Sequence, residues 1–179
     1  MLENYKKHVA ERAEQNIPPL PLDADQTSEL IELLKKDHHE SDFLLNLLKE
    51  RVPAGVDQAA YVKAAFLADI TTGKAFSPYI TKIDAVKILG TMLGGYNIQP
   101  LIECLKDNEL AEAAANVLSR TLLIFDAFNE IFELSKTNEH AKKVVEHIPK
   151  QGVEDRFFCN FGILQNNNRF FNKITLYFI

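Results

Sequence analysis

The stretch Leu89–Ile102, LGTMLGGYNIQPLI, decides the fold. Its helical apolar pattern runs into Gly94-Gly95, stops there, and restarts at Asn97. Glycine reaches the left-handed backbone conformation that a helix C-cap requires, and asparagine is a good N-cap. Pro100 then falls in the first helical turn, where proline is best tolerated. The stretch therefore predicts two helices joined by a short turn, with nothing catalytic in it.

Similar helix–turn–helix joints recur on both sides of this stretch. A first helix is expected over residues 2–15, ended by the prolines that follow. Signals that start or stop later helices are Asp23, Asp57, Gly73, Thr81, Asn108, Asn138 and Pro149. The segment 121–134, TLLIFDAFNEIFEL, is apolar on most sides at its start, which predicts a central, well-covered helix.

These signals together predict an all-α fold of about nine short helices over residues 1–151. No convincing strand pattern appears before about residue 157. Helix pairs of this size, stacked on one another, are typical of an α-solenoid. Internal similarity is too weak to fix a repeat period.

Composition bounds the functional class. The chain has 179 residues, of which 46% are hydrophobic and 25% charged, with a formal net charge of −5. Its lysines occur as scattered pairs, whereas a nucleic-acid surface normally shows a concentrated basic face. The amino terminus is charged and lacks the apolar core of a signal peptide, so a cytoplasmic, soluble protein is expected.

Residues 152–179 differ from the rest of the chain. Six of its 12 phenylalanines fall there, and the chain ends in the apolar, β-prone run ITLYFI. A strand with nothing to pair with is an aggregation hazard. We therefore interpret 152–179 as an atypical tail, separate from the helical domain.

The histidines do not indicate a metal site. His38 and His39 lie beside acidic residues, but adjacent side chains point in different directions and no further ligands follow at regular spacing. A solvated turn is the favoured interpretation. His140 and His147 are two helical turns apart, which favours an exposed charged face over a proton relay.

No other residue type supplies an active site either. Cys104 lies on an amphipathic helix and is expected in the core, whereas Cys159 lies in the tail. Glu103 and Glu112 fit the solvent sides of their helices. The Gly94-Gly95 pair lacks the lysine and hydroxyl residue of a phosphate loop. The residues thus predict no catalytic, cofactor-binding or metal-binding site in this chain.

The central stretch also carries a family resemblance. LGTMLGGYNIQPLIECL is similar to the LLGTMxGGYNIxPLI segment of the bacterial aconitase B family, the bifunctional aconitate hydratase and 2-methylisocitrate dehydratase. Further blocks resemble the same family in the same order: LENYKKHVAERAEQNIPPLPLDADQ, FLLNLLKERVPAGVDQAAYVKAAFLADI and LSRTLLIFDAFNEIFELSKTNEHAKKVVE. The resemblance covers about residues 1–147.

The resemblance implies the N-terminal HEAT-like domain of that family. There this domain precedes a swivelling domain and the catalytic body, which hold the cysteines of the [4Fe-4S] cluster and the substrate-binding residues. No such motif has a counterpart here, so this chain alone is expected to bind no cofactor and to be inactive. The implied roles are docking against the catalytic body, forming part of the channel to the active site, and iron-sensitive dimerisation. Binding of mRNA by this region is also implied.

The tail departs from the family pattern. RFFNKITLYFI is similar to the family's first strand of the swivelling domain, but the connection before it differs. A truncated or frame-disrupted product, or a fragment, is the expectation. The alternative is a free-standing helical scaffold or an RNA-binding regulatory module, whose RNA affinity would fall steeply with salt.

Overall fold

The computed structural model describes residues 1–93, 95–121, 124 and 127–154. These residues form nine α-helices and one π-helical segment, and no strand. In chain order they are α1 (Leu2–Glu14), α2 (Ala24–Leu34), α3 (Ser41–Asn46), η1 (Leu47–Arg51), α4 (Gln58–Thr71), α5 (Lys82–Leu89), α6 (Ile98–Cys104), α7 (Ala111–Leu118), α8 (Phe128–Ser135) and α9 (Glu139–Glu154). The all-helical prediction is confirmed for this part of the chain.

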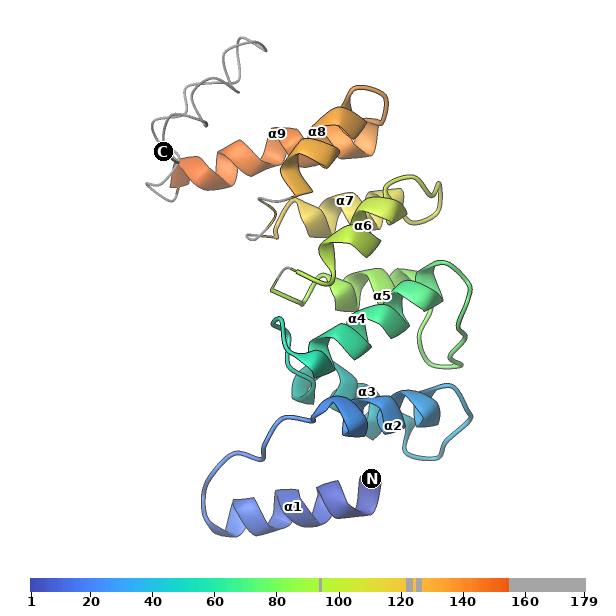
Figure 1. The fold of residues 1–179 in the computed structure, drawn as a ribbon, viewed down its shortest axis with the longest axis vertical. Coiled ribbons are helices and arrows are strands. Elements are labelled where there is room, and N and C mark those ends of the chain that lie inside the picture. Colours follow the sequence, from blue (N-terminus) through green and yellow to red (C-terminus); the bar gives the residue numbers. More distant parts are fainter. Residues whose placement is uncertain (94, 122–123, 125–126, 155–179) are drawn as a thin grey trace.

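The helices are stacked along the long axis of the molecule, from α1 at one end to α8 and α9 at the other (Figure 1). Contacts join α2 to α4, α4 to α5, α5 to α7, and α7 to α9. Each layer therefore packs on the next. The β-prone end expected in the tail falls on residues 155–179, which lie outside the described residues.

Because successive helices run in opposite directions, their connections gather at two edges of the stack (Figure 1). One edge holds the connections 15–23, 52–57 and 90–97, and the last turn of α9 also lies there. The opposite edge holds the connections 35–40, 72–81, 105–110 and 136–138. The irregular backbone of the described residues therefore lies mainly at these two edges.

The predicted helix starts are mostly confirmed. The side chains that accept a backbone N–H of the first turn are Asp23 from Gln26 (2.8 Å), Asp57 from Ala60 (3.0 Å), Thr81 from Asp84 (3.1 Å) and Asn138 from Ala141 (2.9 Å). The predicted start at Asn108 is wrong. There the carboxylate of Asp107 accepts the N–H groups of Glu109 and Leu110, and α7 begins only at Ala111.

Two helix ends differ from the expectation. The helix α1 ends at Glu14, and Asn16 adopts a left-handed φ of 54°, so asparagine and not proline supplies the stop. At the other end of the chain, α9 continues through Pro149 to Glu154. Proline removes one hydrogen-bond donor and disfavours, but does not forbid, a continuing helix. The predicted end at Pro149 is wrong.

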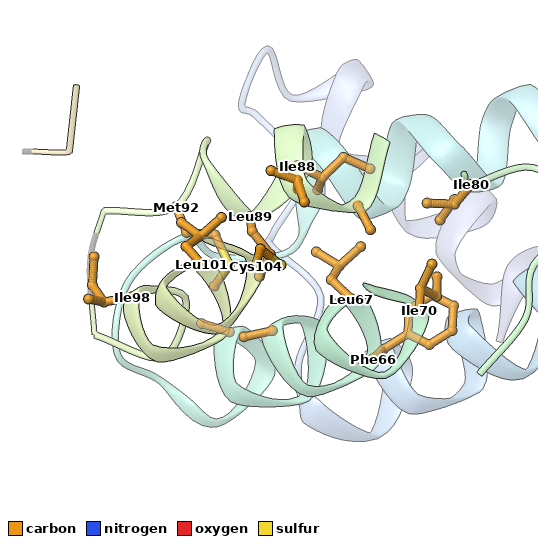
Figure 2. Packing of buried hydrophobic residues seen from close by; sticks show 14 of the residues in the cluster. Phe66, Leu67, Ile70, Ile80, Ile88, Leu89, Met92, Ile98, Leu101 and Cys104 are labelled. Carbon is orange, nitrogen blue, oxygen red and sulfur yellow. The ribbon is translucent and has the colours of Figure 1, made fainter. Parts of the chain in front are cut away.

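The core fills the space between successive layers. Figure 2 shows its central part, where Leu67 and Ile70 of α4 face Ile88 and Leu89 of α5. Cys104 of α6 lies in the same cluster and is 4% exposed. These three helices thus bury apolar side chains against one another. Burying a leucine or isoleucine fully contributes about 1.5–3 kcal/mol, so each interlayer contact is substantial.

The helix predicted over residues 121–134 is shorter than expected where it is described, because Thr121 and Ile124 are not helical. Residues 122–123 and 125–126, which carry most of its apolar start, lie outside the described residues. The helix α8 starts at Phe128, and Ile131 is its one buried residue. It packs on α9 at the end of the stack, where no further layer covers the outer surface within the described part of the chain. The cover expected for that apolar start therefore stays a prediction, although Ile124 within it is 4% exposed.

Candidate functional site

The connection between α5 and α6 is built differently from the prediction. The helix α5 ends at Leu89, and Gly90 follows it with right-handed backbone angles. A Cβ on Gly90 would lie 2.6 Å from Cγ1 of Val117 on α7, so glycine is required here by close packing. The prediction that the helix runs to Gly94-Gly95 is wrong. Gly95 has a φ of +97°, which favours glycine in the turn itself.

Asn97 ties this connection to the preceding helix. Its side-chain Nδ2 donates to the carbonyl oxygens of Leu89 (2.8 Å) and Met92 (3.4 Å), and the residue is fully buried. Asn97 occupies the N-cap position of α6, as predicted, but its side chain accepts no N–H of that helix. Asn97 instead adds a donor to the carbonyl of Leu89, which also accepts the N–H of Met92, and to the carbonyl of Met92 itself.

Two neighbouring connections at this edge are held together by specific contacts. The backbone N–H of Leu93 donates to the carbonyl of Ala54 (3.0 Å), and the hydroxyl of Tyr96 donates to the carbonyl of Val56 (3.1 Å). The ring of Tyr96 also meets that of Tyr61 edge-on, with 5.2 Å between centroids. The connections 52–57 and 90–97 therefore form one continuous surface.

That surface exposes large apolar side chains. Val56 is 73% exposed, Leu93 is 64% exposed and Tyr61 is 50% exposed. Tyr96 is half-buried beside them. We call these four residues the apolar edge.

The opposite edge uses its polar side chains internally. The hydroxyl of Ser77 donates to the carbonyl of Leu34 at the end of α2 (2.6 Å). The hydroxyl of Tyr79 donates to the carboxylate of Asp37 (2.7 Å) and accepts the backbone N–H of His38. The connections 35–40 and 72–81, here called the polar edge, are thus joined by hydrogen bonds.

The burial of one lysine was not predicted from the sequence. Lys63 of α4 is 1% exposed, and its ammonium donates only a long hydrogen bond (3.5 Å) to the carbonyl of Lys49 in η1. Burial lowers its pKa to about 8, while the charge of Glu50 opposes that shift. The spacing from Ala59 to Lys63, Phe66 and Ile70 places it on the apolar face, and this could have revealed it.

The histidines occupy two different settings. His38 is half-buried, and its Nδ1 accepts the backbone N–H of Glu40 (3.1 Å). His39 stacks on it and is exposed at the surface. His147 is exposed as expected, but His140 is half-buried and its Nδ1 has no hydrogen-bond partner among the described residues. The prediction of an exposed face therefore fails for His140.

Cys104 lies in the core as predicted. Burial raises the pKa of its thiol, which makes the nucleophilic thiolate scarce at neutral pH. Cys159 lies outside the described residues. An iron–sulfur cluster needs several cysteine thiolates, so the described residues, which include Cys104 alone, do not fit one.

A shallow groove separates α1 from α2. It measures about 630 Å³ and is lined by Met1, Leu2, Asn4, Glu29, Glu32, Leu33 and other residues of these helices. The terminal ammonium of Met1 lies 3.3 Å from the carboxylate of Glu29. This ion pair links the start of α1 to α2 beside the groove.

Two further findings, on metal binding and on membrane spans, concern the described part of the chain. No group of three or more histidine, cysteine or acidic side chains lies close enough there to hold a metal ion. Among the same residues, no helix is both long and apolar enough to cross a bilayer.

Comparison with known proteins finds a family match over most of the chain. Residues 4–151 match the family described as the aconitate B N-terminal domain. Aconitate hydratase B of Escherichia coli is 57% identical over 148 residues, and that of Synechocystis sp. is 55% identical over 149. The Helicobacter pylori protein is 47% identical over 147 residues.

These alignments take in most of this chain and a small part of each relative. They cover 82% of the chain for the Escherichia coli and Synechocystis proteins and 81% for the Helicobacter pylori protein. The chain spans about 17% of the length of the curated relatives that it matches.

Proposed function

The chain belongs to the family of aconitate hydratase B N-terminal domains. We propose that it acts as a non-catalytic docking domain. The observation that carries the proposal is the match over residues 4–151, which coincides with the helical stack. The matched relatives are named as hydratases, and most of their length lies outside this match. The hydratase chemistry and its [4Fe-4S] cluster then belong to those other parts.

The architecture supports a docking role. Helices that pack layer on layer fit a HEAT-like, right-handed α-solenoid, in which each repeat contacts its neighbours and leaves long edges free. Such edges suit contacts with other domains. Forming part of a channel to the active site, and contacts with a second copy, belong to the same proposal.

The site chemistry is consistent with this division of labour. Cys104 is enclosed by apolar side chains, and His38 already accepts a backbone hydrogen bond. The hydrogen-bonded polar groups at both edges stabilise connections between helices. None of these arrangements brings a base, a nucleophile and an electrophile-stabilising group together among the described residues.

Activity measurement tests the proposal. The purified 179-residue chain, treated with iron and sulfide under reducing conditions, is expected to show no hydration of cis-aconitate above a protein-free control. The full-length Escherichia coli relative, treated in parallel, serves as the positive control. Turnover by the 179-residue chain would contradict a non-catalytic role.

A further inference from the structure

The apolar edge exposes more apolar surface than the fold itself requires. Val56 and Leu93 are 73% and 64% exposed, yet their backbones are fixed by the hydrogen bonds between Leu93 and Ala54 and between Tyr96 and Val56. Rigid apolar groups held out to solvent are typical of binding surfaces. Tyrosine is also enriched at interfaces, because its ring buries area and its hydroxyl keeps a partner.

We propose that the apolar edge is the surface on which the remainder of an aconitate hydratase B chain docks against this domain. This inference rests on the proposed function and adds the place of contact. It commits to the same polypeptide as occupant, in preference to a second copy of the domain.

The course of the chain supports that occupant. The helix α9 runs toward the edge that carries the connections 52–57 and 90–97, and its last turn lies on that side (Figure 1). In the relatives, most of the chain lies beyond the matched region, which is an N-terminal domain. The polypeptide that follows the domain in those proteins therefore starts on the side of the apolar edge.

The small number of residues in the apolar edge also favours the same polypeptide as the occupant. A stable interface between separate proteins buries about 800 Å² on each partner, with some 20–30 residues a side. Four residues fall well short of that number. A covalently tethered segment needs less contact, because tethering raises its effective concentration at the surface. The patch thus suits an intramolecular contact better than a free dimer.

The test uses a hybrid in which residues 4–151 of this chain replace the matching segment of the full-length Escherichia coli relative. One variant carries Val56→Glu and Leu93→Glu. The matched control carries Phe76→Glu, because Phe76 is also 73% exposed but lies on the connection 72–81 at the opposite edge. Limited proteolysis then measures how fast the N-terminal domain is released and digested.

The double variant is expected to release the domain at least tenfold faster than the parent hybrid, while Phe76→Glu leaves the rate unchanged. Circular dichroism of the 179-residue chain with the same substitutions checks that the fold survives. If both variants match a parent hybrid whose domain is protected, docking stands and the apolar edge is the wrong surface. If the parent's domain is digested as fast as the isolated chain, docking itself fails.

Sedimentation of the 179-residue chain tests the other possible occupant, a second copy of the domain. The proposal expects Leu93→Glu to leave the oligomeric state of the chain at micromolar concentration unchanged. A dimer that Leu93→Glu dissociates would assign the apolar edge to a second copy and overturn the proposal.

Discussion

The two edges of the helical stack join their connections by different chemistry. At the polar edge, the hydroxyls of Ser77 and Tyr79 bind groups of the neighbouring connection, so these two side chains serve the fold. At the apolar edge, the backbone of Leu93 and the hydroxyl of Tyr96 make the joins, while apolar side chains face solvent. Both edges therefore stabilise the stack, but the exposed apolar side chains are clustered at the apolar edge and isolated, as Phe76, at the other.

The largest effect is expected at Gly90, where the apolar-edge connection 90–97 begins. A methyl group there would lie 2.6 Å from Val117, so Gly90→Ala should cost about 2–3 kcal/mol through overpacking between α5 and α7. Gly73→Ala, in the connection 72–81, meets open space but a φ of +75°, and should cost about 1–2 kcal/mol. Urea unfolding measures both. Equal stability of the Gly90 variant and the parent would contradict the close packing.

Two asparagines provide the next comparison. Asn97→Ala removes both hydrogen bonds that the fully buried amide donates, to the carbonyls of Leu89 and Met92, and about 2 kcal/mol should be lost. Asn138→Ala removes the N-cap of α9 and a 2.8 Å bond to the carbonyl of Leu105, in a half-buried position, and should cost about 1 kcal/mol. Thermal and urea unfolding should rank Asn97 first. The reverse order would show that the connection 90–97 depends less on its buried amide than the structure indicates.

Lys63 gives a prediction with a definite sign. Its folded-state pKa of about 8 lies below the ordinary 10.5, so the unfolded chain binds more protons between these values. The stability of the parent should therefore rise as pH increases from about 8 toward 10.5. Lys63→Met should remove that rise and stabilise the chain at pH 7 by about 1–2 kcal/mol. Chemical unfolding across this pH range measures the difference, and an unchanged slope would contradict it.

The smallest effect is expected for the exposed apolar groups. Leu93→Ser and Phe76→Ser should each change the stability of the 179-residue chain by no more than about 0.5 kcal/mol, because both side chains already face solvent. Unfolding in urea measures this. A large loss for Leu93→Ser would mean that the apolar edge holds the stack together, and the contrast between the edges would weaken.

Much of the fold could be predicted from sequence because its signals are local. The side chains of Asp23, Asp57 and Thr81 accept hydrogen bonds within their own first turns, so spacing alone reveals them. The same holds for apolar faces at helical spacing. Family membership was also within reach, since LGTMLGGYNIQPLI and its flanking blocks resemble one family in order.

The remainder depends on contacts that sequence spacing does not show. Asn97 looks like an N-cap in sequence, but its amide binds the carbonyl of Leu89, eight residues earlier. Gly90 looks ordinary until α7 approaches it. The apolar edge arises because residues of two connections, about 40 positions apart, meet through Tyr96 and Val56. No pattern within either connection predicts that meeting.

Hydrogen exchange of the two edges tests the docking proposal most directly. Amide exchange is compared between the 179-residue chain and the hybrid with the Escherichia coli relative. The segments compared are 52–61 and 90–97, which contain the apolar edge, and 72–81 of the polar edge. The account predicts slower exchange in the hybrid at the first two segments and unchanged exchange at 72–81. Protection confined to 72–81, or none at either edge, would contradict it.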